Sequence, residues 1–219
     1  VSGGNSVLLG QALSLLLTAA VVATGVQAGI ERLSRWALPL LFVLLIALAI
    51  WAAGLDGAAA GRQTFLLDFD RAQLLNLTTI RNAFTQAFFS IGTGIGCILA
   101  YAAYLDRRAH LPREAVAVVG MDTAVGLLAG LVTFPVVMSF GLQNTISAST
   151  VSTLFVALPT GLASLGTTGR VVAVLFFMLA YLAAITSSVS LLEVPVASLM
   201  DRLGWSRRRA VILATVLIF

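Results

Sequence analysis

The sequence predicts an all-α integral membrane protein in which one spanning helix is discontinuous. Hydrophobic residues make up 59% of the chain and charged residues only 10%, and the mean hydropathy is +1.03. Apolar runs of roughly 20 residues recur, which is the length that a helix needs to cross the hydrocarbon core of a bilayer. A soluble core could not bury so much apolar surface, so we expect a multi-pass protein.

Apolar segments and the turn residues between them define the expected helices. We expect helices at about 7–25, 32–53, 82–104, 114–140 and 167–199, a truncated helix at 207–219 and a short segment at about 148–157. Gly54, Pro112 and Pro159 mark boundaries between these segments. The last apolar run is too short to cross a bilayer, so we expect residues 1–219 to be part of a longer, transporter-sized protein.

Three glycines within five residues interrupt the third expected span at about 90–96. Gly92, Gly94 and Gly96 weaken a helix in lipid, where freed backbone groups have no water to bond. Such a break persists only against protein or a polar cavity, and broken helices at mid-membrane commonly hold a ligand. Alternatively, the glycines allow a neighbouring helix to approach closely.

The distribution of arginines predicts the orientation of the chain in the membrane. Nine arginines lie in the loops after the first, third and fifth helices, whereas the alternate loops hold four. The nine are Arg32, Arg35, Arg107, Arg108, Arg113, Arg202, Arg207, Arg208 and Arg209. Cytoplasmic loops are enriched in basic residues, so we expect these loops in the cytoplasm and the loop at 54–81 outside.

A few polar side chains inside the expected spans are candidate functional residues. Asp122 lies roughly 15 Å into its helix, near the midplane, where a carboxylate is costly unless it is paired, hydrogen-bonded or bound to a cation. Glu193 lies nearer the cytoplasmic end of the fifth helix, and no intramembrane basic residue is an obvious partner for either carboxylate. Thr186 and Ser187 offer hydroxyls suited to sodium, or they bond the preceding helical turn.

Several other classes of protein are disfavoured. One cysteine and one histidine exclude a disulfide framework and a zinc cluster, and no basic, aromatic-interleaved face suggests nucleic acid. Aspartyl proteolysis inside the membrane needs two facing aspartates, and serine chemistry would need a base that His110 cannot readily supply. We therefore expect no enzyme activity and no cofactor.

Spaced motifs, in order along the chain, resemble the bacterial branch of the neurotransmitter:sodium symporter family. They are Gly29-Ile30-Glu31-Arg32, Gln86-Ala87-Phe88-Phe89-Ser90, Asp122-Thr123, Phe134-Pro135 and Thr186-Ser187-Ser188. The resemblance implies the LeuT fold, an inverted-repeat transporter of which this chain would be a fragment covering family helices four to nine. The segment at 148–157 then resembles the extracellular loop helix.

The resemblance also implies two sodium sites. Ser90 and Asp122 correspond to ligands of the first sodium, and Ala183, Thr186 and Ser187 to ligands of the second. A gapless alignment from Phe134 would place Met121 in the position of Asp122, but methionine is a poor sodium ligand, which favours Asp122. Sodium ions are then the coupling ions.

The resemblance further implies a substrate pocket and a function. Its lining residues would be Phe89, Ser90, Gly92, Ile95, Ser187 and Leu191. We expect sodium-coupled symport of a neutral, hydrophobic amino acid by alternating access in the inner (plasma) membrane. The alternatives are a transporter of another small amine or osmolyte, or a transport-inactive scaffold. The expected partners are the amino acid, sodium, the lipid bilayer and the remaining helices of the same transporter.

The orientation predicts which loops a water-soluble reagent reaches. Single cysteines introduced at Arg108 and Arg208 should be labelled only from the cytoplasm, and a cysteine at Asp68 only from outside, because the arginine-rich loops stay in the cytoplasm. Labelling of intact cells and of inverted vesicles with a membrane-impermeant maleimide measures this. The opposite labelling pattern would refute both the orientation and the helix assignment.

Overall fold

The computed structural model describes residues 4–68, 70–105, 108–142, 155 and 158–218, and within them every regular element is a helix. The elements are α1 (Gly4–Ala23), the π-helix η1 (Val26–Ile30), α2 (Glu31–Ala53), α3 (Ala58–Leu66), α4 (Arg71–Leu74), α5 (Leu77–Ile91), the 3₁₀ helix η2 (Thr93–Ile95), α6 (Cys97–Ala102), α7 (Leu111–Ser139), α10 (Leu158–Ala163), α11 (Gly166–Leu203) and α12 (Arg207–Ile218). The segment expected at 148–157 lies outside the described residues, Phe155 excepted.

Membrane-length helices dominate the fold. Four helical stretches are long and apolar enough to cross a bilayer, and they are Ser6–Ala23, Val26–Ala53, Leu111–Ser139 and Gly166–Leu203. At 1.5 Å per residue, the 38 residues of α11 extend about 57 Å, well beyond the hydrocarbon core of about 30 Å, so α11 must tilt or project from the membrane. The predicted all-α membrane fold is confirmed.

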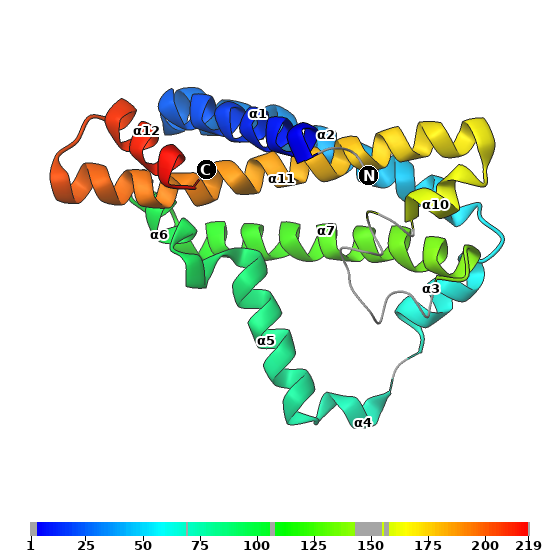
Figure 1. Cartoon of the computed structure of the whole chain (residues 1–219). Coiled ribbons are helices and arrows are strands. Elements are labelled where there is room, and N and C mark those ends of the chain that lie inside the picture. Colours follow the sequence, from blue (N-terminus) through cyan, green and yellow to red (C-terminus); the bar gives the residue numbers. More distant parts are fainter. Residues whose placement is uncertain (1–3, 69, 106–107, 143–154, 156–157, 219) are drawn as a thin grey trace. The chain divides into compact units, whose positions relative to one another are not determined.

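The discontinuous helix predicted near 90–96 is also confirmed. The segment expected as one span at 82–104 consists instead of α5, η2 and α6 (Figure 1). Gly92 and Gly96, at the two ends of η2, both adopt the left-handed conformation, with φ of 76° and 85°. A Cβ disfavours that region, which explains glycine at both positions.

The expected outer loop at 54–81 contains helices that hydropathy does not predict. These are α3, α4 and the first turn of α5. The Asp70 side chain caps α4 by accepting a 2.9 Å hydrogen bond from Ala72 N, and Asn76 accepts a 2.9 Å hydrogen bond from Thr78 N before α5. Because these helices are short and partly polar, no membrane-length apolar run predicts them, and α4 and α5 begin at the side-chain caps Asp70 and Asn76.

The chain forms two compact units, each with its own core. The first consists of Val1–Pro39, Gln86–Leu111 and Tyr181–Phe219. Its buried cluster joins α1, η1, α11 and α12, and α12 runs back beside the end of α11 (Figure 1). The cluster comprises Val22, Ile30, Val189, Leu192, Val196, Ala210, Val211 and Ala214.

The second unit consists of Leu40–Thr85 and Pro112–Ala180. Its buried cluster comprises Leu45, Leu48, Ala52, Val132, Val136, Leu162 and Val172. Glycines bring α3 against α7: a Cβ on Gly61 would lie 2.5 Å from the Cα and N atoms of Pro135. At the start of α3, Gly57 N donates a 3.1 Å hydrogen bond to Ser139 Oγ, which itself donates to Pro135 O at 2.7 Å.

Gly61→Ala should destabilise the second unit by about 1–3 kcal/mol, because the added methyl group meets backbone atoms that cannot rotate away. The matched control is Gly120→Ala in α7, whose Cβ would have no neighbour within 4 Å. That change should be neutral or stabilise the helix by up to about 1 kcal/mol. Thermal unfolding in detergent compares them, and equal stability of the two variants would contradict the close approach of α3 and α7.

Candidate functional site

The helix break is the centre of the candidate site. After Ile91 the chain turns at Gly92, passes through one turn of 3₁₀ helix and turns again at Gly96 before α6. Gly92 N donates to the carbonyls of Phe88 and Phe89, both at 3.1 Å, and this closes α5. The break therefore interrupts the regular helical hydrogen bonds and presents backbone groups as possible ligands.

Four predicted pocket residues flank this break, and all belong to the first unit. The side chains of Phe89 and Ile95 are 69% and 42% exposed, whereas Gly92 is buried. The sequence suggests that Gly92 leaves space for a substrate. Its φ of 76° adds a backbone reason for glycine, because a side chain there would strain the turn. Ser90 occupies the last turn of α5.

Two of the three oxygens predicted for the second sodium lie close together on α11, also in the first unit. Thr186 Oγ1 is 2.9 Å from the Ala183 carbonyl oxygen and 3.1 Å from the Leu182 carbonyl oxygen. Ser187 is exposed one residue further on, and the predicted pocket residue Leu191 lies one turn beyond it. Two oxygens 2.9 Å apart can share one cation at the distance of about 2.4 Å typical of hard ions.

The geometry also supports the alternative that these hydroxyls bond the preceding helical turn. Thr186 and Ser188 both donate to carbonyls of the preceding turn, Ser188 to Ala184 O at 2.9 Å. A hydroxyl has one hydrogen, however, so Thr186 can bond only one of its two carbonyl neighbours at a time. When it donates to Leu182, the Ala183 carbonyl and the lone pairs of Thr186 remain available to an ion.

Asp122 belongs to the second unit. It lies in the middle of α7 and is half-buried, whereas the adjacent Met121 is 51% exposed. Among the described residues, no three His, Cys, Asp or Glu side chains are grouped as a metal cluster. Hydroxyl and carbonyl oxygens suffice for a sodium ion, so this finding leaves the predicted ligand set unchanged.

The sequence did not reveal the partner of Glu193. The Glu193 side chain is fully buried and forms an ion pair with Arg207, at the first position of α12. Tyr104 also donates to Glu193 Oε1 at 3.2 Å, and Arg207 Nε donates to Val22 O at 2.7 Å. No intramembrane basic residue is an obvious partner in the sequence, and Arg207 comes instead from the arginines assigned to the loop after the fifth helix. The turn after α11 brings Arg207 back to a residue 14 positions earlier.

Contacts between α6 and α11 connect the helix break to the helix that carries the sodium ligands. Tyr101 OH donates to Ser190 Oγ at 2.8 Å, and Cys97 Sγ lies 3.8 Å from Ser190 O. A Cβ on Gly96 would lie 3.4 Å from Val194 Cγ1, so the backbone of the break passes close to α11. Sequence reasoning missed Tyr101 and Ser190.

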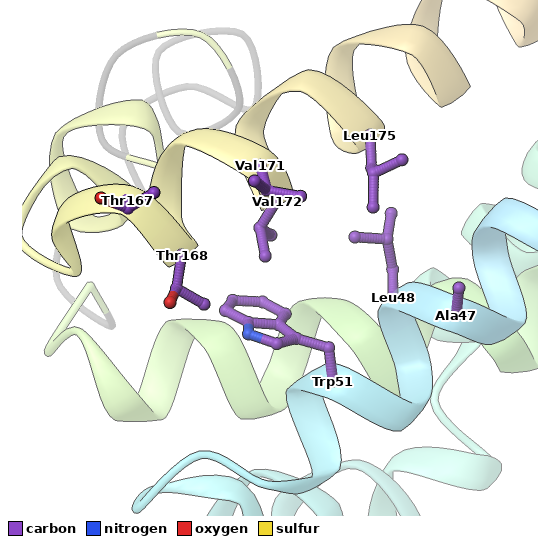
Figure 2. Close-up of a pocket in the computed structure, with 8 residues that line it drawn as sticks. All are labelled: Ala47, Leu48, Trp51, Thr167, Thr168, Val171, Val172 and Leu175. Carbon is purple, nitrogen blue, oxygen red and sulfur yellow. The ribbon is translucent and has the colours of Figure 1, made fainter.

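A cavity of about 380 Å³ lies in the second unit, between α2 and the first turns of α11 (Figure 2). Trp51 extends across it toward Val172 and Thr168 (Figure 2). Its lining comprises Ala47, Leu48, Trp51, Thr167, Thr168, Val171, Val172 and Leu175. This mainly apolar lining includes none of the predicted site residues.

Comparisons with known proteins find sodium-dependent transporters that are similar to this chain. The family model described as the sodium:neurotransmitter symporter family matches residues 4–219. The uncharacterised sodium-dependent transporter YhdH of Bacillus subtilis is 38% identical over 196 residues, which are 88% of this chain and 41% of YhdH. Sodium-dependent nutrient amino acid transporter 1 of Drosophila persimilis is 30% identical over 180 residues, covering 80% of this chain and 28% of the relative.

A solved structure is also similar to this chain. The crystal structure of MhsT in complex with L-phenylalanine matches with a TM-score of 0.82 and 42% sequence identity, over 95% of this chain and 46% of MhsT. MhsT has the LeuT fold. The chain thus spans less than half the length of each of these three proteins.

Arg207→Met should lower the free energy of unfolding by about 3–5 kcal/mol, because it leaves the Glu193 carboxylate buried without its cation. The double variant Glu193→Met with Arg207→Met should regain most of this loss, since no uncompensated charge remains. Arg209→Met removes an exposed arginine two positions after Arg207 and serves as the control. Thermal unfolding in detergent measures all three, and an Arg207→Met variant as stable as the control would contradict the role of the pair.

Proposed function

Since the chain belongs to the sodium:neurotransmitter symporter family, we propose that the complete protein carries a neutral, hydrophobic amino acid into the cell together with sodium. It is a multi-pass membrane protein with several membrane-length apolar helices. The whole transporter would alternate between outward- and inward-facing states, and this chain would contribute part of its binding site. The proposed location is the inner (plasma) membrane.

The break between Gly92 and Gly96 is the observation that carries this proposal. In lipid, a helix can be interrupted only where its freed backbone groups meet protein or a polar ligand. Here the break lies in the same unit as the hydroxyl and carbonyl oxygens of α11, so polar groups for an amino acid and an ion occur together. Discontinuous helices use such groups to bind substrates and coupling ions.

The proposed pocket residues support a neutral substrate side chain. Phe89, Gly92, Ile95 and Leu191 carry no charge, so a charged substrate side chain would be left unpaired at a cost of several kcal/mol. The large exposed surfaces of Phe89 and Ile95 suit an aliphatic or aromatic side chain. The similar protein MhsT was crystallised with L-phenylalanine, which belongs to this class, and the Drosophila relative is named a nutrient amino acid transporter.

Two groups of oxygens are proposed as sodium ligands. Ala183, Thr186 and Ser187 would bind the second sodium through one carbonyl and two hydroxyls. Ser90 and Asp122 would bind the first, with the Asp122 carboxylate offsetting the charge of the ion, which would account for an acidic residue in the middle of a membrane-length helix. Because sodium occupancy would stabilise the substrate-binding conformation, the sodium gradient would drive uptake.

Uptake into proteoliposomes containing the full-length gene product tests the proposal. Labelled leucine should enter saturably under an inward sodium gradient, and the uptake should disappear when potassium replaces sodium. Unlabelled phenylalanine and tryptophan should compete, whereas glutamate and lysine should not. Uptake that does not depend on sodium, or stronger competition by glutamate or lysine, would refute the proposal, and absence of uptake would favour a transport-inactive scaffold.

Asp122→Ala should raise the sodium concentration for half-maximal uptake by about tenfold or more, because a charged ligand oxygen is lost. The folded yield should change little. Met121→Ala is the matched control, one residue away on α7. If Met121→Ala altered the sodium dependence while Asp122→Ala left it unchanged, the assignment of the ligand to Asp122 would be wrong.

A further inference from the structure

A chain of hydroxyl groups links the inner part of the broken helix to the proposed second sodium site. Tyr101 OH, in α6, donates to Ser190 Oγ at 2.8 Å, and Ser190 Oγ donates to the Thr186 carbonyl oxygen at 3.1 Å. We infer that Tyr101 and Ser190 are positioning residues that hold the Thr186 turn of α11 in the geometry that binds sodium. This inference rests on the proposed function.

The direction of the two hydrogen bonds follows from the number of hydrogens. Each hydroxyl has one hydrogen and two lone pairs. The Ser190 hydrogen goes to the Thr186 carbonyl within α11, so its oxygen is left to accept the hydrogen of Tyr101. Replacing Tyr101 with phenylalanine therefore removes the link between the two helices and leaves the bond within α11 in place.

The geometry at Thr186 explains why this turn needs support. Its hydroxyl lies 2.9 Å from Ala183 O and 3.1 Å from Leu182 O and can donate to only one of them. Donation to Leu182 leaves the space between the Thr186 and Ala183 oxygens for the ion, whereas donation to Ala183 places the partly positive hydroxyl hydrogen there, which repels a cation. Hydroxyls that bond the preceding turn bend a helix, so a small change in the curvature of α11 alters the balance between the two arrangements.

Ser190 lies one turn after Thr186 and acts on the carbonyl group of Thr186 itself. Neighbouring contacts hold the Tyr101 and Ser190 side chains in place. The Tyr101 ring packs against the buried cluster of the first unit, Cys97 Sγ lies 3.8 Å from Ser190 O, and Val194 contacts the Gly96 position. A partly buried hydrogen bond such as this one has a stronger orienting effect than a fully exposed one.

Tyr104 provides a matched comparison. It lies three residues after Tyr101 and also donates one hydrogen bond to α11, to Glu193 Oε1 at 3.2 Å. Its acceptor belongs to the ion pair with Arg207, seven residues beyond Thr186, and not to the turn that carries the sodium ligands. Tyr104 lies in the turn that follows α6, so Tyr104→Phe removes the same chemical group from another contact with α11 and leaves the hydroxyl chain in place.

Sodium titration of amino-acid uptake tests the inference in proteoliposomes of the full-length gene product. Tyr101→Phe and Ser190→Ala should each raise the half-saturating sodium concentration about three- to tenfold, as expected for the loss of one hydrogen bond. The KM for leucine at saturating sodium should stay close to the wild-type value. Ser190→Thr keeps the hydroxyl and should retain the wild-type sodium dependence, while Tyr104→Phe should lower the thermal unfolding midpoint and leave the sodium dependence unchanged.

Three results would overturn the inference. The first is a Tyr101→Phe variant whose half-saturating sodium concentration shifts no more than that of Tyr104→Phe. The second is a loss of thermal stability in Tyr101→Phe with unaltered sodium dependence, which would make the contact purely structural. The third is wild-type protein without sodium-dependent uptake. That result would overturn the proposed function itself, whereas the first two would leave it standing.

Discussion

The need to satisfy backbone hydrogen bonds in lipid determines the rest of this structure. Water is absent from the hydrocarbon core, so a spanning segment must bond its own N–H and C=O groups, and helices do this best. The described chain accordingly uses long helices, and glycines bound a break in the expected span at 82–104, between Gly92 and Gly96. Helix α11 packs against this break through Val194 and Ser190. The proposed binding site includes this helix break.

Polar side chains in the first unit obey a related constraint. Glu193 is fully buried, and its carboxylate contacts both the guanidinium of Arg207 and the hydroxyl of Tyr104. Such buried pairs add little net stability because both charges lose their hydration, but removing one partner is costly. The pair therefore acts mainly as a geometric constraint, and it sets where α12 meets α11 at the end of α1, where Arg207 also bonds Val22.

Local sequence patterns predicted much of this arrangement. Membrane-length apolar runs predicted the long helices, and three close glycines predicted the break, because both signals are local. The short helices α3 and α4 were not predicted because neither has a membrane-length apolar run, and α4 begins instead at the Asp70 side-chain cap. The polar chemistry of the expected spans indicated Asp122, Thr186 and Ser187, the resemblance to a family added Ser90 and Ala183, and the roles of all five are proposals.

The sequence by itself determined that the protein lies in a membrane, that it is helical, where the helix break lies and to which family the protein belongs. Hydropathy, glycine clusters and ordered motifs can all be read directly along the chain. Only the tertiary structure decided that Glu193 pairs with Arg207 and that Tyr101 bonds Ser190. Each of these contacts joins different helices, and Tyr101 and Ser190 are 89 positions apart. A single sequence does not reveal such pairs, because they depend on the turn and on the packing that bring the helices together.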